Sequence, residues 1–304
     1  MPDRIRGLWC ATLTPLGAAG EPDHARLAAH VTRLFGAGVD GIALFGTTGE
    51  GQSFSMAERR AGLDGVLARG VGAERVIAGT GCAALTETIE LTRHAVTAGC
   101  AGALVLPPFF FKGISDDGLY ASYARLIDRV GDGRLKLYLY HIPQVTEVPI
   151  AHDVIARLLE RYPGVVAGIK DSGGDFQHTR RLLARFGELA ILVGHEPHLP
   201  TALAEGGAGT ICGIANLYPR LMRRFHDRSL GGGYEEDLQR IETFIARLER
   251  YPLLAAFKAL LADLTADQAW EALRPPLVPL AAAQRRGWIA AVAETGIVAE
   301  RGTT

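Results

Sequence analysis

The chain has 304 residues, of which 48% are hydrophobic and 21% are charged, proportions that are ordinary for a globular protein. Its formal net charge of −1 provides neither the basic field of a nucleic-acid-binding protein nor the polybasic face of a membrane-surface protein. No apolar signal core follows Met1, and the longest uncharged stretch, 95–111, is interrupted by glycines and by two adjacent prolines. We therefore expect a cytoplasmic protein that binds neither nucleic acid nor membrane.

The cysteine and histidine patterns indicate neither a disulfide framework nor a metal centre. The cysteines, Cys10, Cys82, Cys100 and Cys212, are far apart and form no C-x-x-C pair. The nine histidines show no ligand-like spacing along the chain, so we expect no metal.

Short apolar runs alternate with amphipathic segments along most of the chain. The expected strands cover residues 8–13, 41–45, 76–79, 102–106, 136–140, 165–169, 190–193 and 209–211. The expected helices include 23–35, 56–69, 86–98, 118–129, 151–161, 176–186 and 198–205, and Ser55 with Glu58 predicts a capping box at the second of them. Eight strand–helix repeats predict a closed (β/α)8 TIM barrel over 1–233. Residues 234–304 predict a C-terminal helical extension that packs on the barrel.

In such a barrel the catalytic residues lie at the carboxyl ends of the strands, so the residues that follow each strand are the candidates. After the second strand, Gly46-Thr47-Thr48-Gly49 combines two hydroxyls with free backbone N–H groups, which suits a bound carboxylate. The same segment is also typical of a glycine-bounded turn with threonine caps. After the fourth strand, Phe109-Phe110-Phe111 predicts an apolar wall or a subunit contact near the site, with Phe110 as a candidate substrate contact.

The fifth and sixth strands end in the side chains that are best suited to catalysis. Tyr140 offers a phenol for proton transfer, and the adjacent His141 is either a substrate contact or a hydrogen-bonded core residue. The apolar run 165–169 is followed directly by Lys170. Burial there disfavours the ammonium form, and a neutral amine is a nucleophile that forms an imine with a carbonyl substrate. The alternative is a lysine that lies past the strand and points into water.

The last two strands predict further substrate contacts. His195-Glu196 follows the seventh strand and presents polar groups that suit a substrate tail, although a solvated loop is the alternative. Ile214 follows the eighth strand and is a candidate apolar contact.

Taken together, these segments resemble the dihydrodipicolinate synthase/N-acetylneuraminate lyase family of class I, Schiff-base aldolases. The landmarks are Gly46-Thr47-Thr48-Gly49-Glu50, Gly79-Thr80-Gly81, Tyr140-x-x-Pro143, Gly168-Ile169-Lys170-Asp171-Ser172 and Arg274-Pro275-Pro276-Leu277, which span most of the chain. The resemblance implies that Lys170 forms an imine with pyruvate or another 2-oxo acid. It also implies that Tyr140 relays protons and that Thr47 and Thr48 hold the carboxylate. An aldehyde partner, no cofactor beyond the imine, and a homotetramer built from two dimers are further implications.

Several positions depart from the pattern of the resembling synthases. Phe110 stands where those enzymes have a tyrosine from a neighbouring subunit, and Val145 stands where they have an arginine for a substrate carboxylate. His141 and Glu147 replace the asparagine and glycine that are usual in sugar-acid lyases. We therefore expect a pyruvate-dependent aldolase or lyase that is not a 4-hydroxy-tetrahydrodipicolinate synthase. The alternatives are that synthase and a non-catalytic protein that binds a 2-oxo acid.

Overall fold

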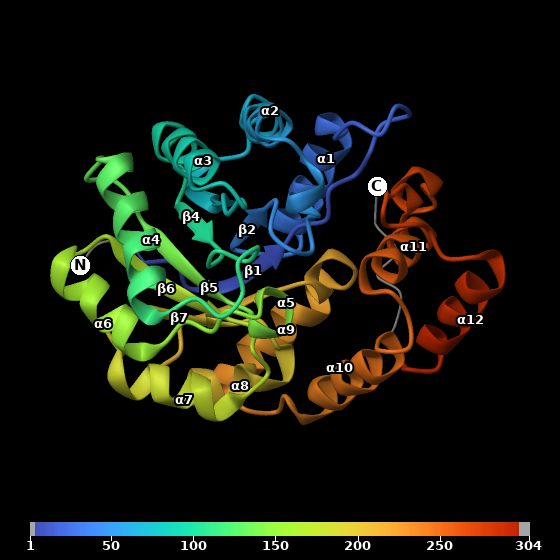
Figure 1. Ribbon diagram of the computed structural model, residues 1–304. Helices are drawn as coiled ribbons and strands as arrows, with labels where there is room; N and C mark the ends of the chain where they lie inside the picture. The colour runs from blue at the N-terminus through green and yellow to red at the C-terminus, as the bar shows by residue number, and fades with distance from the viewer. Residues whose placement is uncertain (1–3, 298–304) are drawn as a thin grey trace.

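The computed structural model describes residues 4–297, which fold around a closed barrel of eight parallel strands (Figure 1). The strands are β1 (Gly7–Ala11), β2 (Gly41–Leu44), β3 (Val76–Gly79), β4 (Gly102–Val105), β5 (Leu137–His141), β6 (Val166–Asp171), β7 (Ala190–Val193) and β8 (Gly209–Cys212). Each strand pairs with the next in sequence, and β8 pairs with β1 to close the barrel. The predicted fold is confirmed, and every strand boundary lies within two residues of its prediction.

The helices surround the barrel and extend beyond it. They are α1 (His24–Gly36), α2 (Met56–Leu67), α3 (Leu85–Thr97), α4 (Asp116–Val130), α5 (Pro143–Thr146), α6 (His152–Arg161), α7 (Phe176–Arg185), α8 (Leu199–Ala204), α9 (Pro219–Gly231), α10 (Glu235–Leu248), α11 (Leu253–Thr265) and α12 (Ala282–Ala293). The predicted capping box is present at α2, where Ser55 and Glu58 satisfy each other's backbone N–H groups. Helices α5 and α9 were not predicted; each begins with a proline, which is preorganised for the first helical position.

The barrel interior is packed with side chains from alternate strand positions. Tyr138 belongs to this core, fully buried, and its hydroxyl accepts the backbone N–H of Ile5 at 3.2 Å. Its ring fits because glycines occupy the neighbouring strands: a Cβ at Gly102 or Gly168 would lie within 2.8 Å of the ring. This packing makes the barrel a solid core, so a substrate has access only from its ends.

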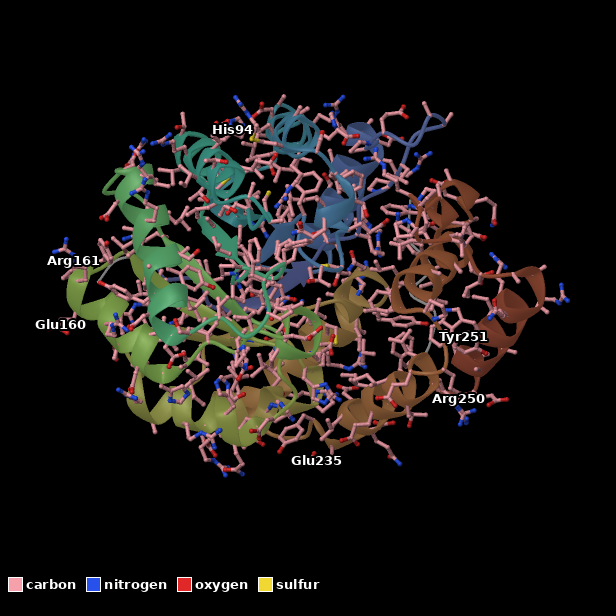
Figure 2. The ribbon with its side chains drawn as sticks, viewed as in Figure 1. His94, Glu160, Arg161, Glu235, Arg250 and Tyr251 are labelled. Atoms are coloured by element: carbon pink, nitrogen blue, oxygen red, sulfur yellow. The ribbon has the colours of Figure 1, made fainter. Side chains whose placement is uncertain are left out.

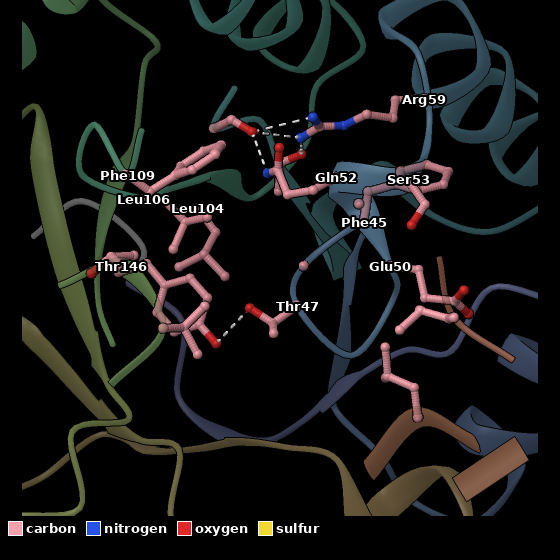
Figure 3. Close-up of a pocket in the computed structure, with 18 of the residues that line it drawn as sticks. Phe45, Thr47, Glu50, Gln52, Ser53, Arg59, Leu104, Leu106, Phe109 and Thr146 are labelled. Carbon is pink, nitrogen blue, oxygen red and sulfur yellow. Dashed lines mark hydrogen bonds between the residues drawn. The ribbon is translucent and has the colours of Figure 1, made fainter. Parts of the chain in front are cut away.

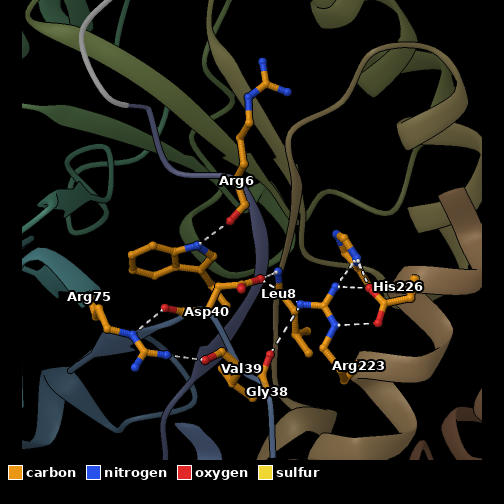
Figure 4. Close-up of polar contacts among 10 residues, drawn as sticks. Arg6, Leu8, Gly38, Val39, Asp40, Arg75, Arg223 and His226 are labelled. Atoms are coloured by element: carbon orange, nitrogen blue, oxygen red, sulfur yellow. Dashed lines mark hydrogen bonds and ion pairs between the residues drawn. The ribbon is translucent and has the colours of Figure 1, made fainter.

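A polar network closes the barrel at the amino ends of its strands (Figure 4). The Asp40 carboxylate accepts the backbone N–H of Leu8 at 2.7 Å and an N–H of Arg223 at 2.9 Å. Arg75 donates to the carbonyl oxygens of Val39 and Asp40. These contacts join β1, β2 and α9 at the amino ends of the strands. In this architecture that end contributes to stability, whereas the catalytic residues lie at the opposite end.

Helices α10, α11 and α12 lie together on one side of the barrel (Figure 1). Phe244 and Trp288, both fully buried, join these helices to a hydrophobic core that continues through α9 and α1. Because the core is continuous, the division at residue 234 stays a prediction.

Charged side chains such as Glu160 and Arg250 project outward (Figure 2). No helix within residues 4–297 is both long and apolar enough to cross a membrane.

Candidate active site

Lys170 and Tyr140 lie side by side inside the carboxyl end of the barrel. They are partners in the register of β5 and β6, and the Lys170 Nζ lies 4.4 Å from the centre of the Tyr140 ring. Both side chains are buried, with Lys170 only 4% exposed. The sequence placed Lys170 just after its strand, whereas β6 continues through Asp171. The extended backbone turns Lys170 into the barrel and excludes the alternative of a lysine that points into water.

The Tyr140 hydroxyl connects Lys170 to the loop after β2. Thr47 donates a hydrogen bond to it at 3.3 Å (Figure 3). Burial alone raises the pKa of Tyr140, but the charge of Lys170 and hydrogen bonds from Thr47, Lys170 and Ser172 outweigh it, so the pKa falls below its ordinary value. A phenol with a lowered pKa beside an amine is well suited to exchange protons with it.

The loop that carries Thr47 and Thr48 is a tight turn with little freedom. The N–H of Gly51 bonds to the carbonyl of Gly46 at 3.0 Å, and Thr14 donates to the carbonyl of Gly49 at 2.7 Å. A Cβ at Gly51 would lie 1.9 Å from the Phe45 carbonyl oxygen, so only glycine fits there. The geometry holds the two hydroxyls at the mouth of the barrel.

A cavity of about 280 Å³ surrounds Lys170. Of the residues predicted from sequence, it is lined by Lys170, Tyr140, Thr47, Thr48, Glu196 and Ile214. A second cavity of about 220 Å³, lined by Gly46, shares Thr47 and Tyr140 with the first (Figure 3). The two cavities therefore meet at the hydrogen bond between Thr47 and Tyr140.

Sequence reasoning missed one wall of the Lys170 cavity. Ile245 and Leu248 of α10 and Leu253 and Phe257 of α11 line it, opposite the polar residues of the loops that follow β6 and β7. In the sequence, these four residues fit the apolar face of an ordinary amphipathic helix. No neighbouring motif marks them as residues of a site. Only the return of the extension to the mouth of the barrel brings them to the site.

Glu196 contributes a carboxyl group that is buried in the Lys170 cavity. Its Oε1 accepts the backbone N–H of Ile214 at 3.4 Å. Burial raises the pKa of Glu196, and the N–H of Ile214 and the charge of Lys170 only partly oppose that shift. The structure therefore places a carboxyl group with a raised pKa, which suits proton exchange, near the predicted nucleophile. Glu196 is no part of a solvated loop.

His141 does not face the Lys170 cavity, so it is not part of the site that we propose. It follows Tyr140 in β5, and alternation turns its side chain toward α6 and α7, where it lines a separate cavity. There it stacks on His178 with ring centres 4.1 Å apart. Of the two readings from sequence, the hydrogen-bonded core histidine is the one that the structure supports.

His141, Asp171 and His178 bring three potential metal ligands within 4.8 Å of one another, a cluster that sequence spacing did not predict. The Ile150 N–H donates to the Nδ1 of His141 at 3.2 Å, and burial lowers the pKa of this ring to about 4. The neutral ring therefore carries its proton on Nε2, where a metal would need a lone pair. Asp171 is already engaged by His178, Thr179 and Gly173. The cluster is best described as a hydrogen-bonded support behind β6.

Comparisons with known proteins agree with this geometry. The model of the dihydrodipicolinate synthetase family matches residues 4–294. The chain belongs to this family. A protein named an uncharacterized DapA-like lyase, from Chloroflexus aurantiacus, is 38% identical over 281 residues, which are 90% of this chain and 92% of the relative.

Solved structures of the family share the fold throughout. The dihydrodipicolinate synthase of Agrobacterium tumefaciens is 34% identical, with a TM-score of 0.90 over 96% of this chain and 99% of the other. The enzyme of Acinetobacter baumannii, solved in complex with pyruvate, is 27% identical, with a TM-score of 0.85 over 97% of this chain and 100% of the other.

The aromatic segment after β4 departs from the sequence expectation in one respect. Phe109 lines the smaller cavity, but the side chains of Phe110 and Phe111 are 69% and 65% exposed. Phe110 therefore does not line the Lys170 cavity within one chain, and its assignment as a substrate contact is not supported there. The two exposed rings contact each other, with ring centres 5.3 Å apart.

Proposed function

We propose that this member of the dihydrodipicolinate synthetase family is a pyruvate-dependent aldolase or lyase that works through an imine on Lys170. The observation that carries the proposal is the buried Lys170 amine beside the Tyr140 hydroxyl, which in turn accepts a hydrogen bond from Thr47. A nucleophile, a proton carrier and a hydroxyl-rich loop thus converge on one cavity. The related enzyme solved with pyruvate supports the choice of 2-oxo acid.

The chemistry then follows from the positions of these groups. The Lys170 amine attacks the ketone carbon of pyruvate, and the Tyr140 hydroxyl protonates the oxygen, so that the carbinolamine loses water and leaves an imine. Loss of a proton from the methyl carbon gives an enamine, whose carbon attacks the aldehyde to form the new C–C bond. The reverse sequence cleaves that bond, and water releases the product from Lys170.

Thr47 and Thr48 would hold the carboxylate of pyruvate with their hydroxyls and backbone N–H groups. The aldehyde would lie between Glu196 and the apolar wall that α10 and α11 supply. The buried Glu196 carboxyl would exchange a proton with the aldehyde oxygen as it becomes a hydroxyl. This arrangement favours an aldehyde with an apolar portion.

The second candidate function is that of a 4-hydroxy-tetrahydrodipicolinate synthase, since one relative of that name is 34% identical over 93% of this chain. Val145 stands where the resembling synthases have an arginine, and its side chain is 53% exposed. Lys112 lines the smaller cavity beside Val145, but it donates to the carbonyls of Phe109 and Thr146. The Lys112 ammonium also lies 3.7 Å from the Glu147 carboxylate, so its charge is already paired and does not replace that of the missing arginine.

We predict negligible condensation of pyruvate with aspartate semialdehyde. The test is an aldehyde screen with pyruvate that includes this compound beside neutral and apolar aldehydes. Turnover of another aldehyde, with aspartate semialdehyde at background, supports the proposed branch. A kcat/KM for aspartate semialdehyde of about 10⁴ M⁻¹s⁻¹ or more would instead favour the synthase.

We also propose a homotetramer in which Phe110 and Phe111 lie at a subunit contact. Light scattering on a sizing column should give a tetramer for the parent protein. Because charge opposes burial at an interface, a variant with Phe110→Glu and Phe111→Glu should dissociate into smaller species. Leu230→Glu, at an exposed leucine of α9, is the matched control and should stay tetrameric. A monomeric parent at micromolar concentration would contradict this proposal.

A further inference from the structure

The loop that carries Thr47 and Thr48 is bounded by two strained residues. Phe45 has φ of 56° and Glu50 has φ of 55°, in the left-handed region that favours glycine. A non-glycine residue persists there only where its surroundings hold it in place. The Phe45 side chain is held by packing against Phe54. The Glu50 side chain is also buried, but it is polar and needs a polar partner.

The Glu50 carboxylate depends on one partner. Lys258 of α11 lies with its Nζ 2.5 Å from Glu50 Oε1, and neither side chain exposes any surface. Within residues 4–297, neither Glu50 oxygen has a hydrogen-bond partner besides this contact. The ammonium also donates to the carbonyl of Ala272 at 2.8 Å. A buried charge without compensation is strongly unfavourable, so the position of Glu50 is tied to that of Lys258.

The same helix contributes directly to the Lys170 cavity. Phe257, the residue before Lys258, lines that cavity together with Leu253. Gly213 lies between Phe257 and the loop: a Cβ there would be 2.8 Å from the Phe257 ring and 3.7 Å from the Thr48 hydroxyl. Helix α11 therefore meets the loop directly through the ion pair between Lys258 and Glu50, and indirectly through Phe257, which packs near Gly213.

We propose that Lys258 is a positioning residue, which holds the Thr47–Thr48 loop in its binding geometry through the buried ion pair with Glu50. The role of the loop as a carboxylate site rests on the proposed function, but its anchoring by Lys258 does not. Lys258 is thereby distinct from Lys170 in its role: it lines neither of the cavities around Thr47, and its amine is held by Glu50 and by the carbonyl of Ala272.

The test compares Lys258→Met with the parent protein in two measurements. Amide hydrogen exchange of residues 46–54 should accelerate at least about tenfold in Lys258→Met, because the loop loses its anchor. The pyruvate concentration that half-saturates borohydride trapping should rise by at least about tenfold, since misplaced hydroxyls weaken carboxylate binding. The trapping rate at saturating pyruvate should change less, because Lys170 and Tyr140 remain in place.

Two further variants separate positioning from mere stability. Asp237→Asn disturbs a buried carboxylate paired with Arg224 and Arg228 away from the loop, and it should lower the melting temperature without changing either measurement. The double variant Glu50→Gln, Lys258→Met leaves no buried charge, so its melting temperature should recover. Its loop should still exchange rapidly and bind pyruvate weakly.

Unchanged exchange of residues 46–54 in Lys258→Met would overturn the proposal, as would a double variant that regains both parental exchange and parental pyruvate binding. A parent protein that fails to trap pyruvate would refute the proposed function alone. In that case the exchange measurement still decides whether Lys258 anchors the loop.

Discussion

Lys170→Arg should reduce the exchange of the pyruvate methyl protons with deuterated water by at least about 10⁴-fold. This exchange needs only imine and enamine formation, so it measures the role of Lys170 without knowledge of the aldehyde. Arginine keeps the positive charge and much of the bulk, but its guanidinium stays protonated and offers no nucleophilic lone pair. NMR of the pyruvate methyl signal gives the rate.

The control for this prediction is the folded state of the variant. The buried side chain of Lys170 contacts the Tyr140 ring, and arginine retains a cation for that contact, so the melting temperature should change little. Lys170→Met, which removes the charge, should be equally inactive. Methyl exchange in Lys170→Arg above about one hundredth of the parent rate would show that another group forms the enamine.

Tyr140→Phe should slow methyl exchange by about 10²–10⁴-fold, the usual contribution of a positioned acid–base group. Only a hydroxyl is lost, and the ring that lies 4.4 Å from the Lys170 Nζ remains. The carbinolamine then lacks the group that protonates its leaving oxygen, so imine formation should become the slow step. When samples are taken at intervals and reduced with borohydride, the reduced pyruvate adduct should therefore form more slowly in Tyr140→Phe than in the parent protein.

Thr47→Val is the matched comparison for this relay. It removes the hydroxyl that donates to Tyr140 at 3.3 Å but leaves the phenol itself. The loss should be smaller than in Tyr140→Phe and should appear mainly in the half-saturating pyruvate concentration, because we propose that Thr47 also holds the carboxylate of pyruvate. A Tyr140→Phe variant within about threefold of the parent would contradict the relay.

The barrel is predictable from sequence because each strand is a short apolar run followed by an amphipathic helix. The residues at the carboxyl ends of those strands follow directly, which is why Lys170, Tyr140, Thr47 and Thr48, which line one cavity, could be named as candidates from sequence. Of the two readings of His141, the sequence itself could have favoured the core residue. It is adjacent to Tyr140 in one strand, so the two side chains must face opposite sides, and alternation alone excludes a shared cavity.

The contribution of the C-terminal helices is beyond sequence reasoning. Lys258 lies in an apolar helical run, where it reads as an isolated charge, and its partner Glu50 is over two hundred residues earlier. The pairing depends on how α11 folds back onto the loop after β2, which no local pattern encodes. Phe257 and Leu253 are hidden in the same way, because an apolar residue in a helix usually indicates core.

The most direct test of the central claim is to incubate the protein with pyruvate, reduce it with borohydride, and map the modified residue by peptide mass spectrometry. The account predicts one reduced pyruvate adduct per chain, on the peptide that contains Lys170, and none when pyruvate is omitted or when Lys170 is arginine. An adduct on Lys258, or the absence of any adduct at saturating pyruvate, would contradict it.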